Sequence, residues 1–291
     1  MADPTLVTPD LLREWALPEP GSSKHARGTV LVVGGSSSTP GAVILSGESS
    51  LRVGGGKLQV ATARSIAAQV SLALPEALVR GFPEDDSGGV EADACDDIFA
   101  MAEGASSVLL GPGLMDPDAA AALLEGIVPR LDTTVVIDAL GSAYLTKHID
   151  GLHHLEGRCV LTLNLNEVAK TLGVEKDDVE DDPEGAATEL AGKARAVVLA
   201  GGSKKFVATP DGDSWLVQEG GPGLGISGSG DVQAGFVAGL VARGAEPAQA
   251  AVWGAFLHGS AGDRLADEIG PLGFLARELP AVVPGLLRDF A

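Results

Sequence analysis

Short apolar runs alternate along the chain with longer segments in which apolar residues recur every three or four positions. Most of the runs are rich in Val, Leu, Ile and Ala and stop at a Gly, Asp or Asn. Such runs are typical of parallel strands buried on both faces, and the intervening segments have helical spacing and flanks. We predict strands at 29–33, 57–62, 107–110, 133–137, 159–162 and 196–200, and helices at 40–52, 116–130, 166–172 and 183–194. This alternation predicts an α/β fold of three layers, with a mostly parallel central sheet and helices on both faces.

The other segments complete a single domain over residues 1–291, since no repeat and no long linker divides the chain. Residues 206–209 and 214–217 flank an Asp-Gly turn, which predicts a β-hairpin, and the chain after Asp231 is expected to be mostly helical. The first 28 residues hold four prolines and predict an irregular arm, with room for a short helix at 10–15. The acidic, Gly-containing stretch 84–97 predicts an exposed loop.

The segment Gly223-Leu-Gly-Ile-Ser-Gly-Ser-Gly-Asp231 precedes a run at helical spacing, so a helix is predicted to begin near Asp231. Glycines reach positive φ and can aim several backbone N–H groups at one point, where a helix N-terminus adds positive partial charge. This predicts an anion hole for phosphate oxygens, with Asp231 beside it to take a proton from an attacking hydroxyl. The alternative is that Asp231 is an ordinary N-cap after a flexible loop.

The net charge of the chain limits the kinds of molecule that it is expected to bind. Forty acidic residues against 20 basic ones give a net charge of −20, which argues against nucleic acid and anionic membranes as partners. Cys95 and Cys159 stand far apart without a metal-binding or disulfide pattern. The N-terminus lacks the features of a signal peptide, and no apolar stretch has the length of a membrane span, so a cytoplasmic protein is expected.

Besides the Gly-rich turn, several further segments resemble a known family, and together the matching segments extend over nearly the whole chain. The order and spacing of these segments resemble the ADP- or ATP-dependent NAD(P)H-hydrate dehydratases of the ribokinase-like superfamily, in which Gly228–Asp231 corresponds to the GxGD signature. The matching pieces are residues 24–35, 40–42, 52–57, 74–77, 111–114, 137–139, 161–167 and 257–259. The resemblance implies phosphoryl transfer from ADP or ATP to the ring hydroxyl of hydrated NADH or NADPH, followed by loss of phosphate.

The resemblance also implies roles for individual residues. Asp231 is then the base on the hydroxyl, and Gly228, Ser229 and Gly230 stabilise the transferred phosphoryl group. The hydrate is expected to touch Ala42, Gly113 and Asn164. The nucleotide is expected to lie along Ala200, Gly201, Gly202, Ser203 and Lys204, together with Gly230. Magnesium is the implied cofactor, with Glu167 as its candidate ligand in an incomplete NxxE-type region.

Two positions depart from the family pattern. Asn164 stands where relatives usually have a His, so a role that needs protonation is lost there. Ala200 stands where many relatives have a Lys, and Lys204 or Lys205 is the candidate to reach the phosphates instead. His258 is expected to be a hydrogen-bonded core or interface histidine, and Asp138 to serve either the site or a turn.

Two other functions remain open on these residues. A ribokinase-like kinase for a small alcohol or vitamin precursor would share Asp231 and the anion hole and would release a stable phosphorylated product. The departures at positions 164 and 200 suggest a second alternative, a nucleotide-binding protein without turnover. Either nucleotide, ADP or ATP, fits an anion hole that reads phosphates, and the Ala-rich helices favour a homo-oligomer.

Overall fold

The computed structural model describes residues 3–290, and their ten strands form one sheet in the order β1-β10-β9-β8-β7-β6-β5-β2-β3-β4. Neighbouring strands are parallel except at β8–β9 and β9–β10. The strands are β1 (Thr5–Leu6), β2 (Thr29–Val33), β3 (Lys57–Ala63), β4 (Ala77–Phe82), β5 (Ser107–Leu110), β6 (Thr134–Asp138), β7 (Cys159–Leu163), β8 (Val197–Gly201), β9 (Lys205–Ala208) and β10 (Ser214–Val217). The mostly parallel sheet predicted from the apolar runs is confirmed.

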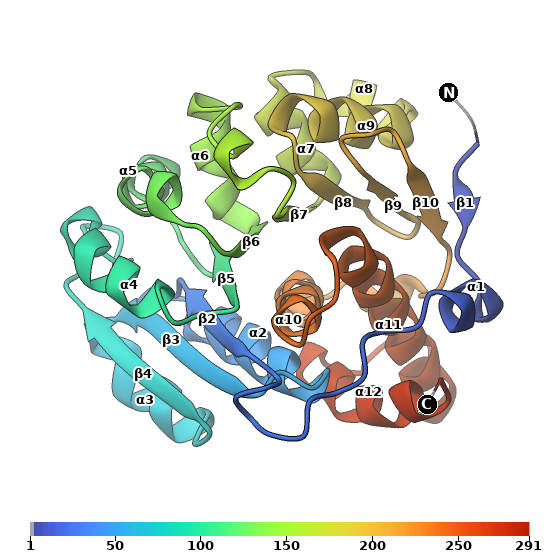
Figure 1. Cartoon of the computed structure of the whole chain (residues 1–291), viewed down its shortest axis with the longest axis horizontal. Helices are drawn as coiled ribbons and strands as arrows, with labels where there is room; N and C mark the ends of the chain where they lie inside the picture. Colours follow the sequence, from blue (N-terminus) through green and yellow to red (C-terminus); the bar gives the residue numbers. More distant parts are fainter. Residues whose placement is uncertain (1–2, 291) are drawn as a thin grey trace.

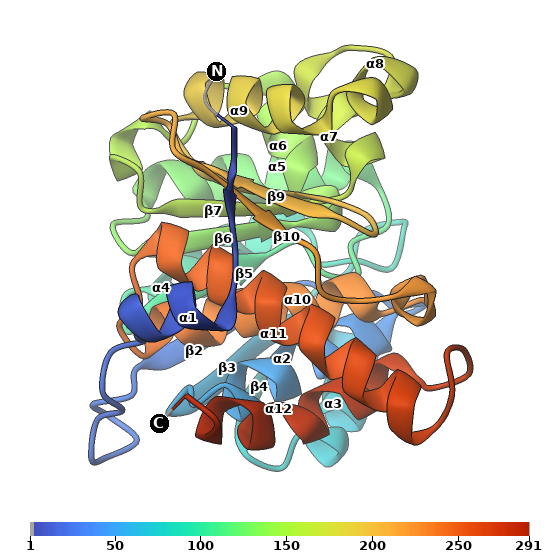
Figure 2. The same ribbon diagram turned by 90° about the vertical axis from the view of Figure 1, so that its right-hand side faces the viewer.

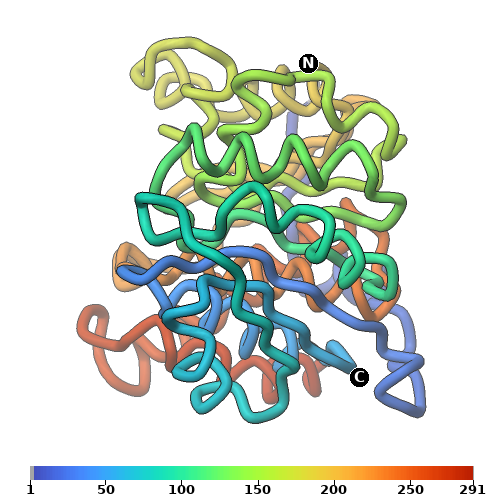
Figure 3. Tube along the Cα trace, turned by 90° about the vertical axis from the view of Figure 1, so that its left-hand side faces the viewer, coloured from blue at the N-terminus to red at the C-terminus, as the bar shows by residue number. Residues whose placement is uncertain are grey.

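Helices cover both faces of this sheet, as predicted (Figure 1). One face packs against α2 (Pro40–Arg52), α3 (Ala67–Ala73), α10 (Ser229–Ala242), α11 (Pro247–Glu268) and α12 (Leu279–Arg288). The other face packs against α4 (Cys95–Ala102), α5 (Pro117–Ile127), α6 (Ala143–Lys147), α7 (Leu165–Leu172) and α9 (Pro183–Ala194), with α8 (Lys176–Asp181) beside α7. Figure 3 shows the same layers from the side, with the green and yellow helices above the sheet and the red helices below it. Each face has its own core of small aliphatic side chains.

The N-terminal residues contain more structure than the predicted irregular arm. β1 pairs with β10 at one edge of the sheet, and α1 (Pro9–Glu14) follows it (Figure 2). The indole Nε1 of Trp253 donates a 2.9 Å hydrogen bond to the carbonyl oxygen of Trp15, which holds the end of α1 against α11. The short helix expected at 10–15 is therefore present, one residue earlier, because Thr8 caps it and Pro9 begins it.

Residues 64–102 depart from the sequence predictions. β4, which follows α3, was not predicted because it is an edge strand in which Arg80 and Gly81 cut the apolar run to three residues, 77–79. The stretch predicted as an exposed loop at 84–97 contains a 3-10 turn at Ala92–Ala94 and the start of α4. Val90 and Ala94 are buried in this stretch, so the segment contributes to the core although its acidic side chains are mostly exposed.

Two glycines set the position of α10. A methyl group on Gly235 would lie 2.3 Å from the carbonyl oxygen of Ser46, and one on Gly239 would lie 2.3 Å from that of Ser50. Because glycine has no side chain, the backbones of α10 and α2 approach more closely at these two positions than they could with any other residue. As a result the N-terminus of α10 lies beside the carboxyl ends of the central strands. No helix among residues 3–290 is long and apolar enough to cross a membrane.

Candidate active site

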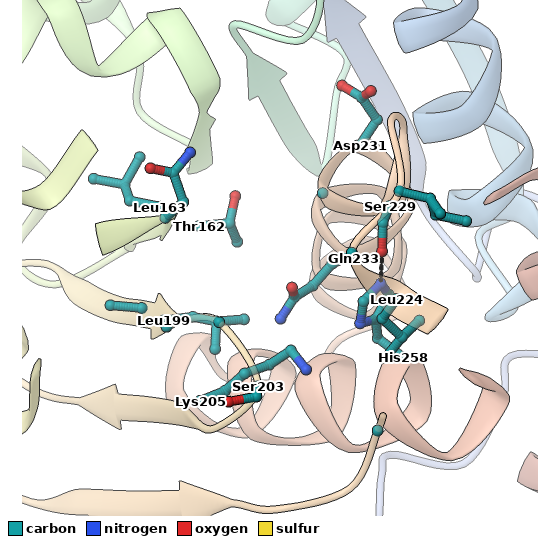
Figure 4. Close-up of a pocket in the computed structure, with 18 of the residues that line it drawn as sticks. Thr162, Leu163, Leu199, Ser203, Lys205, Leu224, Ser229, Asp231, Gln233 and His258 are labelled. Carbon is teal, nitrogen blue, oxygen red and sulfur yellow. Dashed lines mark hydrogen bonds between the residues drawn. The ribbon is translucent and has the colours of Figure 1, made fainter. Parts of the chain in front are cut away.

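A cavity of about 540 Å³ lies at the carboxyl ends of β6, β7 and β8. Its opposite wall is the first turn of α10 together with the Gly-rich segment 220–226, and α11 closes its inner end (Figure 4). Ligands of open α/β sheets bind at this end of the strands. The residues along the wall are Asp138, Ala139, Thr162, Leu163, Asn164, Glu167, Leu199, Ala200, Gly201, Gly202, Ser203, Lys205, Gly220, Gly221, Pro222, Leu224, Gly225, Ile226, Ser229, Gly230, Asp231, Gln233 and His258.

The first turn of α10 is open toward this cavity. Gly228 occupies the N-cap at φ 89°, a conformation that glycine adopts without strain, and no side chain caps the helix. The helix begins at Ser229, two residues earlier than predicted, so Gly230 and Asp231 stand in its first turn. The alternative role of Asp231 as N-cap is therefore wrong. Within residues 3–290 no backbone carbonyl accepts from the N–H groups of Gly228 and Gly230, whereas the N–H of Ser229 donates a 3.2 Å hydrogen bond to the carbonyl oxygen of Ile226. The positive end of the helix and these two free N–H groups form a site for an anion.

Three carboxylates from three elements approach one another at this end of the cavity: Asp138 at the end of β6, Glu167 on α7 and Asp231 on α10. Burial, together with the charge of Glu167, raises the pKa of Asp231 to about 6. Burial and the charges of Asp231 and Glu167 hold the pKa of Asp138 well above its usual range, although Thr162 Oγ1 donates a 2.8 Å hydrogen bond to it. At neutral pH Asp231 is therefore largely ionised but remains able to accept a proton.

Asn164 and Glu167 form a reciprocal capping box at the start of α7. The backbone N–H of Glu167 donates to Asn164 Oδ1 at 3.0 Å, and the backbone N–H of Asn164 donates to Glu167 Oε2 at 2.9 Å. This pair fixes the helix and explains locally why an Asn is stable at position 164. Burial also raises the pKa of Glu167.

The strand ends on the other side supply small residues and one lysine. Ala200, Gly201, Gly202 and Ser203 line the cavity, as expected for the nucleotide segment. The side chain of Lys204 is exposed and does not line the cavity. β9 begins at Lys205, and it is the Lys205 side chain that turns inward. By sequence alone, either lysine is a candidate to reach the phosphates. The alternation of β9 distinguishes the two, because position 205 shares a face with the buried Val207.

His258 lies at the inner end of the cavity, on α11. Its ring Nε2 and the Ser229 hydroxyl are 2.9 Å apart, and the side chain is buried, so the expected hydrogen-bonded core histidine is confirmed. Burial, with the neighbouring charge of Lys205, lowers the pKa of His258 to about 3, so the imidazole is neutral. It therefore positions Ser229 without adding charge.

Ala42 and Gly113, the expected contacts of the hydrate, lie together but outside this cavity. A methyl on Gly113 would lie 2.9 Å from the Ala42 side chain, and Thr39 Oγ1 donates a 2.7 Å hydrogen bond to the Gly113 carbonyl. Ala42 follows β2 and Gly113 follows β5, and in the sheet β5 lies between β2 and β6. The predicted site residues therefore fall into two groups, both at the carboxyl ends of the central strands.

Among residues 3–290, no three His, Cys, Asp or Glu side chains come close enough together to hold a metal ion by themselves. Carboxylate oxygens are nevertheless the donors that Mg²⁺ prefers, and Mg²⁺ in nucleotide sites takes one or two of them together with phosphates and waters. Asp138 and Glu167 have the right chemistry for this arrangement. Their raised pKa values also mark a place where an added cation is favourable.

Known proteins resemble this chain in sequence and in fold. The family model described as NAD(P)H-hydrate dehydratase matches residues 30–284. An ADP-dependent (S)-NAD(P)H-hydrate dehydratase of Xanthomonas campestris is 44% identical over 283 residues, covering 97% of this chain and 95% of the relative. The crystal structure of the ADP/ATP-dependent NAD(P)H-hydrate dehydratase of Bacillus subtilis, co-crystallised with ATP/Mg²⁺, matches with a TM-score of 0.81 at 25% identity, and each chain is covered completely.

A ribokinase-like protein of Enterococcus faecalis matches with a TM-score of 0.82 at 22% identity, over 99% of this chain and 96% of that one. The match to this structure shows the ribokinase-like fold. The sequence match to the Xanthomonas campestris enzyme covers almost the same part of the chain. The fold expected from the GxGD turn is thereby confirmed. The chain belongs to the NAD(P)H-hydrate dehydratase family.

Proposed function

We propose that this protein restores NADH or NADPH from its hydrate, using ADP or ATP as the phosphoryl donor. The observation that carries the proposal is the pairing of an uncapped helix N-terminus with a carboxylate whose pKa is about 6, both on one cavity wall. The first feature suits a phosphoryl group and the second suits a hydroxyl that attacks it. Family membership supports the same reaction.

In the first step Asp231 takes the proton of the hydrate's ring hydroxyl as that oxygen bonds to the terminal phosphorus of the nucleotide. The bond from this phosphorus to the bridging oxygen breaks, which releases AMP from ADP or ADP from ATP. The free N–H groups of Gly228 and Gly230 stabilise the negative charge of the phosphoryl group in transit, while the N–H of Ser229 donates to the Ile226 carbonyl oxygen and holds the turn in place. In the second step phosphate leaves with its oxygen, a neighbouring ring carbon gives up a proton, and the ring double bond returns.

The substrate and the nucleotide are proposed to approach from different sides. The nucleotide lies along Ala200–Ser203, and the hydrate lies against Ala42, Gly113 and Asn164. Asn164 Oδ1 is engaged with its own helix, so its amide nitrogen is the group that remains to donate a hydrogen bond to the hydrate.

Mg²⁺ fits beside Asp138 and Glu167, where it would neutralise phosphate charge and orient the donor. This chain's own residues then supply the base and the helix dipole. Such a cation would also offset the negative charge that Asp231 and Glu167 present to a polyphosphate placed near them.

The test is the recovery of reduced-nicotinamide absorbance from NADH hydrate with magnesium and ADP, ATP or no nucleotide. Recovery that requires a nucleotide supports the proposal and identifies the donor. A stable phosphorylated product without recovery of the absorbance would instead establish a kinase for another alcohol as the better description. Nucleotide binding with no product from any hydroxyl substrate would leave a binding protein.

We further propose that the protein acts in the cytoplasm as a homo-oligomer that binds small molecules only. The support for assembly is the free sheet edge at β4, where Leu78 is 54% exposed and Leu72 on the adjacent α3 is 84% exposed. Large exposed apolar side chains on neighbouring elements are typical of interfaces. Light scattering of the purified protein, with Leu72→Glu as the disrupting variant, tests this proposal.

A further inference from the structure

The cavity contains a lysine that no protein group satisfies. Lys205, the first residue of β9, is 5% exposed, yet it lines the cavity, and its amine points into the same space as Gln233 and His258 (Figure 4). Within residues 3–290, the side-chain amine of Lys205 takes part in no hydrogen bond or ion pair, although its backbone pairs with both neighbouring strands. The backbone register pairs Lys205 with Gly201, so the position of this side chain is fixed by the sheet.

Two carboxylates face this lysine without pairing with it. Glu219 and Asp263 both favour its charged form, but neither lies within the distance of an ion pair. Asp263 Oδ2 accepts a 2.9 Å hydrogen bond from the backbone N–H of Gly220, and Glu219 Oε2 is buried without a partner. The stem of Lys205 is buried while its amine opens into the cavity, and the partial loss of water around this cation lowers the pKa of Lys205. A cation that is partly desolvated and has no contacting protein partner is costly to a folded protein. Its retention in this cavity therefore points to a negatively charged ligand.

The surroundings indicate which part of a ligand this cation meets. Lys205 is the single Lys or Arg along the cavity wall, whereas three carboxylates line the opposite end. It acts on the charge state of His258, whose ring contacts the Ser229 hydroxyl in the first turn of α10. The cation and the open helix end thus share one space, as expected for two groups that hold a chain of phosphates.

We propose that the Lys205 ammonium binds the phosphates of the nucleotide, on the side of the cavity facing the N-terminus of α10. It supplies the positive charge that Ala200 and the exposed Lys204 do not bring to the cavity. This inference rests on the proposed use of ADP or ATP. It adds a residue that positions the donor and identifies the polyphosphate, rather than the base or the ribose, as the group it recognises.

The test is calorimetric binding of ADP and of adenosine to Lys205→Met, which keeps the length and apolar stem of the side chain. A charge-assisted hydrogen bond contributes about 1.5–3 kcal/mol, so the Kd for ADP should rise roughly 10- to 150-fold. The Kd for adenosine should change less than about twofold, because no phosphate is present. Lys193→Met, an exposed position on α9 with the same change in charge, should leave both constants unchanged.

Thermal unfolding without ligand provides a second readout. Because the wild type holds a partly desolvated ammonium without a contacting partner, Lys205→Met should melt at or above the wild-type temperature while its stabilisation by ADP shrinks. If the variant does not fold, Lys205→Gln serves the same comparison, and Lys205→Arg should restore part of the ADP affinity.

Two outcomes would overturn the proposal. Equal weakening of ADP and adenosine would place the lysine on the base or the ribose. A lower melting temperature with unchanged ADP affinity would make it a counter-ion of Glu219 and Asp263. Both measurements use nucleotide binding and folding alone, so they are independent of whether the hydrate is the true acceptor.

Discussion

Replacing Asp231 by Asn removes the carboxylate beside the open end of α10 and keeps the size of the side chain. Its pKa of about 6 leaves this carboxylate mostly ionised at neutral pH and close to the operating range of a general base. A positioned base contributes roughly 10²- to 10⁴-fold to a rate. We therefore expect kcat to fall by that factor, while the Kd for ADP stays the same or decreases as the charge beside the phosphates is removed.

The same substitution should stabilise the folded protein, because burial and the charge of Glu167 disfavour the ionised carboxylate. The rise in the pKa from 3.8 to about 6 corresponds to roughly 3 kcal/mol as an upper bound, since Asp231 is only partly buried and solvent screens part of it. A raised pKa in the folded state gives stability that is present below the unfolded pKa and lost as the pH rises through about 6. Asp231→Asn should thus melt above the wild type near pH 8 and at a similar temperature near about pH 4.

The assay combines three measurements on Asp231→Asn and wild type: recovery of reduced nicotinamide from NADH hydrate with ADP and magnesium, ADP binding by calorimetry, and melting temperature against pH. An inactive variant that still binds ADP and is more stable at neutral pH is the expected result. Activity within tenfold of the wild type would refute the role of Asp231 as the base. A loss of stability at neutral pH would refute the electrostatic argument.

Three further results are expected. In the wild type, kcat/KM should fall about tenfold per pH unit below about 6, as Asp231 becomes protonated, and a profile flat down to about pH 4 would contradict this. Asp138→Asn should raise the melting temperature at neutral and alkaline pH but not near about pH 4, because the raised pKa of Asp138 means that its ionisation opposes folding. Gly235→Ala should lose roughly 1–3 kcal/mol of unfolding free energy, since its methyl would lie 2.3 Å from the Ser46 carbonyl oxygen. Gly192→Ala, where nothing lies within 4 Å of the added methyl, should gain up to about 1 kcal/mol, and an equal loss at both positions would contradict the packing argument.

The central strands were predictable because parallel strands buried on both faces appear as continuous apolar runs. β2 and β5 agree with their predicted bounds, β7 ends one residue later than predicted, and β6 and β8 begin and end one residue later. β4 has no such pattern, because an edge strand is exposed on alternate positions and pairs on one side only. α10 begins two residues before Asp231, because Ser229 and Gly230 carry no apolar side chain that would show helical spacing, while the Val232 N–H already donates to the Gly228 carbonyl oxygen.

The site was only partly predictable for a related reason. The Gly228–Asp231 turn is contiguous, so its chemistry is visible in the sequence. The grouping of Asp138, Glu167 and Asp231 depends on strand order, which brings the ends of β6 and β7 beside α10. The choice between Lys204 and Lys205 could have been predicted from the alternation of β9, because position 205 shares a face with the apolar Val207, but the predicted strand began one residue too late, at 206.

The most direct test of the proposed reaction is the stoichiometry of its products. Purified protein is given NADH hydrate, ADP and magnesium, and the NADH restored is compared with the orthophosphate and AMP released. Phosphorylation followed by elimination predicts equal amounts of the three products, with none formed by Asp231→Asn. NADH restored without equal release of phosphate and AMP would contradict a phosphorylated intermediate, and AMP formed without NADH would show that the phosphoryl group goes to another acceptor.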